Sequence, residues 1–294
     1  MAYRVYTWKR RGIDAAHTAI RRTSGLLRWL LPLEVRKALV VRLDRRFRWS
    51  TDFSMGVLGD LRHRDPETLH RFLWSNHLAY AARYQVQHKF EPHNINPTRH
   101  ILFRQILDYY KGRALEPHEQ VRSVFDVGCS LGYLLRHIEL NLFPSAAPLQ
   151  GIDIDRHAVQ AGMAYLQSVR SRVELFEADL SRAGEFMRGR EYDLVLCCGV
   201  LMYTNEDTAM SALQAMFAHC RGLVGVICLA DNARRRAKRN SEVRTSDGAY
   251  VHDTHRMIRE AGGIPISSTW VGTETSGSSP SHVILAERRT PSRH

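Results

Sequence analysis

The chain has 294 residues, of which 44% are hydrophobic and 24% charged, a composition that is ordinary for a soluble globular protein. Its apolar runs are shorter than the roughly 20 residues that span a bilayer, and its first 22 residues lack the apolar core of a secretory signal. The five cysteines lie in apolar segments without C-x-x-C pairing, which argues against a disulfide framework and a zinc site. We therefore expect a cytoplasmic protein whose cysteines are reduced core residues.

The formal net charge of +12 is concentrated near the N-terminus, where residues 1–48 hold thirteen Lys and Arg against three acids. Within residues 25–49, apolar side chains alternate with arginines at roughly helical spacing. This segment either packs its apolar stripe on the rest of the chain or lies in the interface of an anionic membrane, at the inner membrane. Nucleic acid is the other acidic partner that such a basic segment suits.

The first 115 residues contain no series of strands, and prolines interrupt their helical patterns. We expect residues 1–115 to form a basic, helical N-terminal extension or lid, and residues 116–294 to form one α/β domain. The interrupting prolines are Pro32, Pro66, Pro92 and Pro97.

From Val121 onward, short β-like runs alternate with helical patterns, which is typical of a parallel sheet with helices on both faces. The run 192–201 is almost continuously apolar, as expected for a strand that is buried on both faces. The predicted strands are residues 121–128, 149–155, 172–180, 192–201, 222–230, 264–272 and 281–289, with helices at 131–142, 156–170, 181–189, 206–220 and 251–263.

The stretch FDVGCSLG, residues 125–132, predicts a tight turn between the first strand and the next helix. Gly128 and Gly132 leave room for a ligand to approach the backbone, and the helix N-terminus directs NH groups toward it. A dinucleotide fingerprint requires glycines at 128, 130 and 133, but Ser130 and Tyr133 occupy the last two positions. NAD is therefore disfavoured, and a P-loop is excluded because no G-K-[ST] follows.

The series Asp126, Gly128, Ser130, Gly132 resembles motif I of the class I S-adenosylmethionine-dependent methyltransferases, with serine at the middle glycine. Further along, GIDID ends the second strand with Asp153, where the family binds the ribose hydroxyls. FEADL places Asp179 after the third strand, where the family reads the adenine amino group.

The resemblance implies a Rossmann-like sheet of seven strands with helices on both faces, in which one of the last two strands runs antiparallel to the rest. It implies S-adenosylmethionine as the cofactor. The cofactor-binding residues that it implies are Asp126, Gly128, Cys129, Ser130, Gly132, Asp153, Ile154, Asp179, Leu180 and Gly199.

Methyl transfer to oxygen needs a near-attack geometry, exclusion of water and removal of a proton. The family often has a histidine after the fourth strand, but this chain has Met202 and Tyr203. A free tyrosine has a pKa near ~10 and is a poor base, so we interpret Tyr203 as orienting the acceptor or packing on the cofactor.

His77 is the candidate base, with His70 and His252 as alternatives, although each also suits an ordinary, partly exposed histidine. No cluster of carboxylates or histidines has convincing metal-ligand spacing. We therefore expect transfer without a divalent metal.

These observations favour an O-methyltransferase that acts on a small molecule or on a sugar of a lipid-linked or polysaccharide-linked intermediate. The Asn/Asp-Pro-Pro-aromatic motif of exocyclic-amine methyltransferases is absent after the fourth strand, where the chain reads CCGVLMY. An RNA methyltransferase is the alternative, supported by the net charge and the basic stretch ARRRAKR. A catalytically inactive binding scaffold is the third interpretation.

Overall fold

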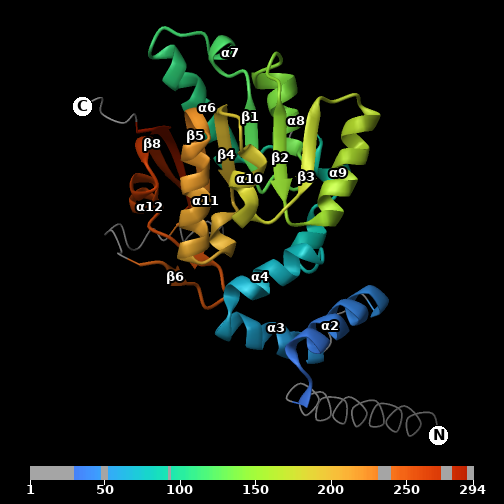
Figure 1. Cartoon of the computed structure of the whole chain (residues 1–294). Helices are drawn as coiled ribbons and strands as arrows, with labels where there is room; N and C mark the ends of the chain where they lie inside the picture. The colour runs from blue at the N-terminus through green and yellow to red at the C-terminus, as the bar shows by residue number, and fades with distance from the viewer. Residues whose placement is uncertain (1–29, 48–51, 92–93, 231–239, 273–279, 290–294) are drawn as a thin grey trace, which may run out of the picture. The chain divides into compact units, whose positions relative to one another are not determined.

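The computed structural model describes residues 30–47, 52–91, 94–230, 240–272 and 280–289 (Figure 1). The chain divides into two compact units, Met1–Phe72 and Leu73–His294. Residues 73–115, which the sequence analysis assigned to the N-terminal extension, thus group with the sheet.

The described part of the N-terminal unit consists of helices, of which α2 begins after Pro32, α3 at Asp52 and α4 at Pro66. Within it, α2 packs against α3, and an Arg36–Asp60 ion pair of 3.8 Å joins the two helices. Val40 and Val57 are buried, whereas Leu30 is 71% exposed. The membrane-binding hypothesis for residues 25–49 stays a prediction, and residues 25–29 and 48–49 lie outside the described residues. The helices are α2 (Leu33–Phe47), α3 (Asp52–Arg64) and α4 (Pro66–Ser75), the last of which crosses the boundary between the units.

The second unit contains the predicted seven-stranded sheet, in the order β3-β2-β1-β4-β5-β9-β8. Strands β1 to β5 pair in parallel, and β9 lies antiparallel between β5 and β8, as the resemblance implies. The strands are β1 (Val124–Val127), β2 (Leu149–Asp153), β3 (Val173–Glu177), β4 (Tyr192–Cys198), β5 (Cys220–Leu229), β8 (Gly263–Val271) and β9 (Ser281–Arg288).

Helices cover both faces of this sheet (Figure 1). On one face lie α6 (Pro97–Lys111), α8 (Tyr133–His137) and α9 (Arg156–Ser168), and on the other α10 (Ala183–Met187), α11 (Glu206–Ala218) and α12 (Thr254–Glu260). The short elements are η1 (Ala81–Arg83), α5 (Val86–Lys89), α7 (Pro117–Gln120), η2 (Ile138–Leu142), η3 (Leu180–Arg182), η4 (Leu201–Tyr203) and the hairpin β6 (Glu242–Val243) with β7 (Tyr250–Val251).

Successive side chains along each strand point to opposite faces of the sheet, so the sheet separates two apolar cores. Leu194 and Leu196 face the core on the α6 side, whereas Val195 and Cys197 face the core on the α11 side. All five cysteines are free and buried, as expected. Among the described residues, no helix has the length and apolar character to span a membrane.

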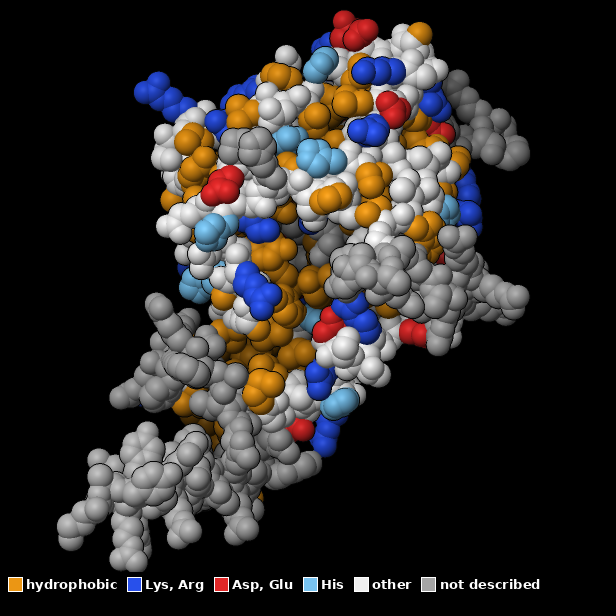
Figure 2. All heavy atoms as spheres, turned by 180° about the vertical axis from the view of Figure 1, so that it is seen from behind, with side chains coloured by type: hydrophobic (Ala, Val, Ile, Leu, Met, Phe, Trp, Pro, Cys, Tyr) orange, Lys and Arg blue, Asp and Glu red, His pale blue; other side chains and the backbone are white. Residues whose placement is uncertain are grey.

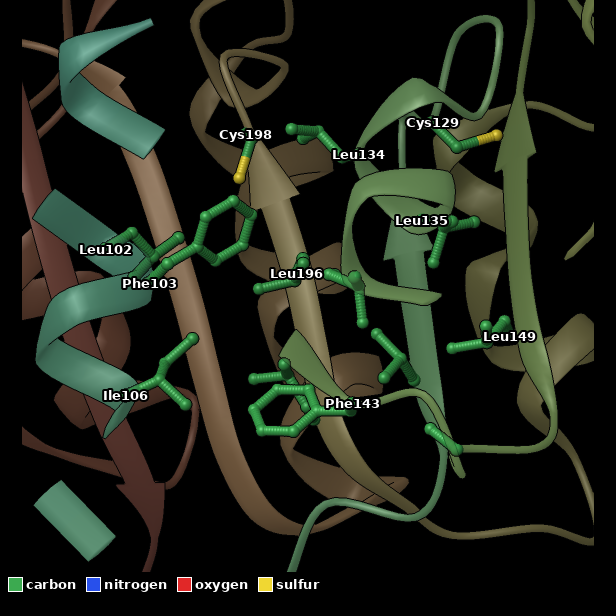
Figure 3. Close-up of a cluster of buried hydrophobic side chains, with 14 of the residues drawn as sticks. Leu102, Phe103, Ile106, Cys129, Leu134, Leu135, Phe143, Leu149, Leu196 and Cys198 are labelled. Atoms are coloured by element: carbon green, nitrogen blue, oxygen red, sulfur yellow. The ribbon is translucent and has the colours of Figure 1, made fainter. Parts of the chain in front are cut away.

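Helix α6 contributes directly to the first core, although the sequence analysis placed it outside the α/β domain. Its side chains Leu102, Phe103 and Ile106 point toward the sheet and toward Leu196 of β4 (Figure 3). Asn96 caps the helix by accepting a hydrogen bond from the backbone NH of Arg99, and Pro97 suits its first turn. The helical pattern was predicted, but its packing partner was not.

We expect Leu102→Ala to lower the free energy of unfolding by about 2–5 kcal/mol, because Leu102 is fully buried and its truncation leaves a cavity. Leu115→Ala is the control, since Leu115 is 39% exposed and its truncation should change stability by less than about 1 kcal/mol. Urea unfolding of the full chain measures both values. Equal effects would contradict the packing of α6 in the core.

Candidate active site

The residues singled out by the motifs gather at one edge of the sheet. Asp126 lies on β1, Asp153 ends β2, Asp179 follows β3 and Gly199 follows β4. Because β1 to β4 are parallel, their carboxyl ends meet at the same edge, where open α/β sheets bind ligands. The structure therefore brings the predicted cofactor-binding residues to one side of the sheet.

The turn after β1 adopts a conformation that explains its small residues. Gly128 has a φ of +82°, and a Cβ there would overlap Val200, so both strain and space require glycine. Gly132 has a φ of +78° and immediately precedes α8. Ser130 has a φ of +52°, which glycine adopts more readily, so the serine at the motif's middle position carries backbone strain.

The Asp153 carboxylate connects this turn to the β2–α9 connection. Its Oδ2 accepts a hydrogen bond of 2.7 Å from the NH of Ser130, and its Oδ1 accepts one of 2.8 Å from the NH of Asp155. Burial raises the pKa of Asp153 to about 6, while the bonds from Asp155 and Ser130 act in the opposite direction. The two bonds fix the orientation of the carboxylate, and its predicted role toward the ribose hydroxyls stays a prediction.

Asp126 is the least satisfied polar group of the site. Its carboxyl is 1% exposed, and neither oxygen has a hydrogen-bond partner among the described residues. Burial raises its pKa to about 7, an effect that the nearby Arg99 opposes and Asp153 reinforces. The buried Oγ of Ser130 also lacks a partner among the described residues. Such unpaired buried groups are costly, and they are expected where a polar ligand binds.

Arg99 is a site residue that the sequence analysis missed. It lies on α6, and its guanidinium Nη2 donates a hydrogen bond of 3.3 Å to the carbonyl oxygen of Cys198 at the end of β4. The same nitrogen lies 3.7 Å from the position that a Cβ on Gly199 would occupy, and Nε has no partner among the described residues. The guanidinium charge of Arg99 also acts on the buried carboxyl of Asp126 and partly offsets the rise in its pKa.

Tyr203 lies in η4, directly after β4, and belongs to a group of rings that we call the aromatic cluster. Its ring stacks on Tyr80 with 5.6 Å between centroids and lies 5.5 Å from Trp74. Trp74 also packs edge-on against Tyr84 at 5.4 Å. Burial raises the pKa of Tyr203, so the phenol is even less suited to act as a base than a free tyrosine. The aromatic cluster consists of Trp74, Tyr80, Tyr84 and Tyr203.

The structure places the candidate histidines in different environments. His77 lies at the β2 end, where its Nδ1 is 2.6 Å from Oδ2 of Asp155. Both ring nitrogens of His252 have partners, the hydroxyl of Ser241 at 2.6 Å and the carbonyl oxygen of Leu201 at 2.9 Å, and burial lowers its pKa. His70 is buried in the N-terminal unit.

The remaining predicted residues flank the same edge. Asp179 accepts hydrogen bonds from the NH and hydroxyl of Ser181 at 2.9 and 2.7 Å and caps η3, which Leu180 begins. Ile154 is half-buried directly after β2. Cys129 is buried against Gly151 in β2. Among the described residues, no group of three or more His, Cys, Asp or Glu is arranged to hold a metal ion, and the absence of a metal requirement stays a prediction.

Comparisons with known proteins agree with this arrangement. Residues 125–223 match the family model of a methyltransferase domain. The chain is similar in structure to magnesium protoporphyrin IX methyltransferase from Synechocystis PCC 6803 with bound S-adenosylmethionine, with a TM-score of 0.50 and 16% identity over 77% of this chain and 98% of that chain.

An N-methyltransferase from Bradyrhizobium japonicum WM9, in complex with S-adenosyl-L-homocysteine, gives a TM-score of 0.47 and 15% identity over 69% of this chain and 96% of that chain. A search of curated protein sequences gives no significant match. The family-model match and the sheet order confirm the resemblance drawn from the motifs. The chain carries a class I methyltransferase domain and is an S-adenosylmethionine-dependent methyltransferase.

The residues at the sheet edge fit this cofactor. Its methionyl part carries an ammonium and a carboxylate, which suit the unpartnered Asp126 carboxyl and the neighbouring Arg99 guanidinium. Glycine is also required at 132, where a Cβ would meet Leu175 and Leu166, so the turn before α8 stays free of side chains at both positions.

We expect Asp126→Asn to raise the free energy of unfolding more at about pH 8 than at about pH 5. The pKa of this carboxyl is 3.8 for the unperturbed group and about 7 in the fold, so the folded chain binds the proton more tightly. Its contribution to stability is therefore lost as the pH rises through about 7, and asparagine removes that loss.

Urea unfolding at the two pH values measures the effect. Asp108→Asn is the control, because Asp108 is exposed on α6 and its change should have the same small effect at both pH values. An Asp126→Asn gain that is independent of pH would show that the carboxyl is solvated or paired in the folded protein.

Proposed function

We propose that the enzyme methylates a hydroxyl oxygen of a small molecule, or of a sugar in a lipid-linked or polysaccharide-linked intermediate. The observation that carries this proposal is the aromatic cluster beside the end of β4, close to the cofactor-binding edge. Aromatic side chains with a few polar groups are the usual lining of small-molecule sites, and their faces suit sugar and planar rings. The absence of the exocyclic-amine motif after β4 also favours oxygen as the acceptor.

The cofactor supplies a methyl group bound to a cationic sulfonium. In the proposal, Asp126 and Arg99 bind the charged ends of its methionyl part, Asp153 accepts hydrogen bonds from the ribose hydroxyls, and Asp179 contacts the adenine. The geometry that supports these roles is the position of all four side chains at or beside the carboxyl edge of the sheet.

Tyr203 has the role of orienting the acceptor. Because burial raises its pKa, the phenol keeps its proton and can donate a hydrogen bond to the acceptor. Its stacking on Tyr80 holds the ring in place beside β4.

RNA is the alternative acceptor, and the net charge of +12 favours it. Lysine, arginine and histidine side chains are interspersed with hydrophobic ones on the face shown in Figure 2. The basic stretch at 233–239 lies outside the described residues. Peripheral binding to the inner membrane through residues 25–49 is a further proposal, and it suits a lipid-linked acceptor.

We expect Arg99→Met to weaken the binding of S-adenosylhomocysteine by about 10- to 100-fold, the size expected when a hydrogen bond to a charged group is lost. Binding of 5′-methylthioadenosine, which lacks the amino-acid part, should change by less than about threefold. Arg99→Lys should lie between wild type and Arg99→Met, because lysine keeps the charge but not the planar fork. Titration calorimetry measures all three proteins, and an equal loss for both ligands would contradict the assigned contact.

The acceptor is tested by incubating the protein with labelled S-adenosylmethionine and separate pools of small-molecule glycosides, lipid-linked glycans and tRNA. We expect label in a glycoside or lipid-linked glycan, stable to treatment that cleaves esters, and equal incorporation with and without EDTA. Labelled RNA would establish the alternative, and a need for added magnesium would contradict a metal-independent transfer.

A further inference from the structure

The segment from Trp74 to Tyr84 contacts both sides of the cofactor-binding edge. Trp74 and Tyr80 both pack on Tyr203, which follows β4. Between them in the sequence, His77 contacts Asp155 after β2. We call residues 74–84 the strap, because it joins the ends of strands that lie on opposite sides of β1.

The strap is held in a defined conformation. His77 and Ala79 both have a φ of +53°, which is uncommon for residues other than glycine and persists only where the surroundings enforce it. The NH of Leu78 donates to the carbonyl oxygen of Leu73 at 2.9 Å, and Leu78 and Ala81 are buried. The backbone strain at His77 is therefore offset by contacts that present its ring to Asp155.

A chain of hydrogen bonds runs from this ring to the glycine-rich turn. His77 Nδ1 lies 2.6 Å from Oδ2 of Asp155, a carboxylate with no exposed surface whose Oδ1 accepts a bond of 3.0 Å from the NH of Ala158. The backbone NH of Asp155 donates to Oδ1 of Asp153 at 2.8 Å, and Oδ2 of Asp153 accepts from the NH of Ser130 at 2.7 Å. Each link orients the next one.

We propose that His77 is a positioning residue for cofactor binding: it fixes Asp155, and through Asp155 the carboxylate of Asp153 and the turn at Ser130. The inference rests on the proposed role of Asp153 toward the ribose of the cofactor. It replaces the interpretation of His77 as the base, because the ring lies at the β2 end, bonded to Asp155. An acceptor must instead reach the ends of β4 and β5.

Two substitutions at position 77 separate the side chain from the backbone. His77→Gly removes the ring at a position where glycine is unstrained, and His77→Asn restores a donor of similar reach in a residue that tolerates positive φ. His118→Ala is the control, since His118 is exposed on α7, before β1. All are made in the full chain.

Calorimetry with S-adenosylhomocysteine gives the first readout. We expect His77→Gly to weaken binding on the order of tenfold, His77→Asn to recover most of the affinity, and His118→Ala to match wild type. Unchanged affinity in His77→Gly with a large fall in methyl-transfer rate would make His77 the base and overturn the proposal. Failure of wild type to bind this ligand would instead reject the proposed function, and the positioning role with it.

Hydrogen exchange without the cofactor gives a second readout that does not depend on activity. The NH of Ser130 should exchange faster in His77→Gly than in wild type and should return toward the wild-type rate in His77→Asn. The NH of Thr208 donates a hydrogen bond to the side chain of Asn205 at the start of α11, and the exchange rate of this amide should not change. Faster exchange at both amides, or loss of cooperative unfolding, would show a general effect on stability and overturn the positioning role.

Discussion

The candidate site depends on one buried carboxylate that binds two backbone NH groups from different connections. Asp153 accepts from Ser130 in the turn after β1 and from Asp155 in the connection after β2. These connections belong to neighbouring parallel strands, so the carboxylate fixes their relative position at the sheet edge. The positive φ angles at Gly128, Ser130 and Gly132 are then maintained by contacts outside the turn itself.

The site also contains a buried carboxyl whose loss of hydration is not compensated by hydrogen bonds from the described residues. Asp126 is buried without a hydrogen-bond partner among the described residues, and the favourable charge that acts on it is that of Arg99, whose own side chain bonds to the carbonyl oxygen of Cys198. A core position with this arrangement lowers stability, and an apolar residue there would not. Local destabilisation of this kind is expected where a sequence is selected for ligand binding as well as for folding.

Much of this architecture could be predicted because it depends on local patterns. The apolar runs, their spacing and the glycine turn indicated the strands, their parallel arrangement and the ligand-accessible turn after β1. The motif resemblance added that one of the last two strands is antiparallel, which periodicity alone does not determine, and the structure shows that this strand is β9. The replacement of the motif's middle glycine by Ser130 was also visible in the sequence. In the structure this serine has a φ of +52°, a backbone conformation that is strained for residues other than glycine.

The contacts that surround the cofactor edge could not be predicted, because they join residues far apart in the sequence. Arg99 meets Cys198 and His77 meets Asp155 across separations of 99 and 78 residues. Neither residue has a local pattern that identifies its partner: Arg99 follows a helix cap, and His77 occupies a turn with no glycine to indicate its positive φ.

The contacts of the strap predict a coupling between the binding of the acceptor and the binding of the cofactor. The strap contributes three of the four rings of the aromatic cluster beside β4 and contacts the Asp155 carboxylate beside β2, so the proposed acceptor and cofactor sides share one short segment of chain. On the proposed roles, a change in the packing of Tyr80 on Tyr203 is expected to alter the support of His77, and a change at His77 is expected to alter the packing of Tyr203. Acceptor and cofactor are expected to bind with a coupling free energy, and by linkage each affects the affinity of the other by the same factor.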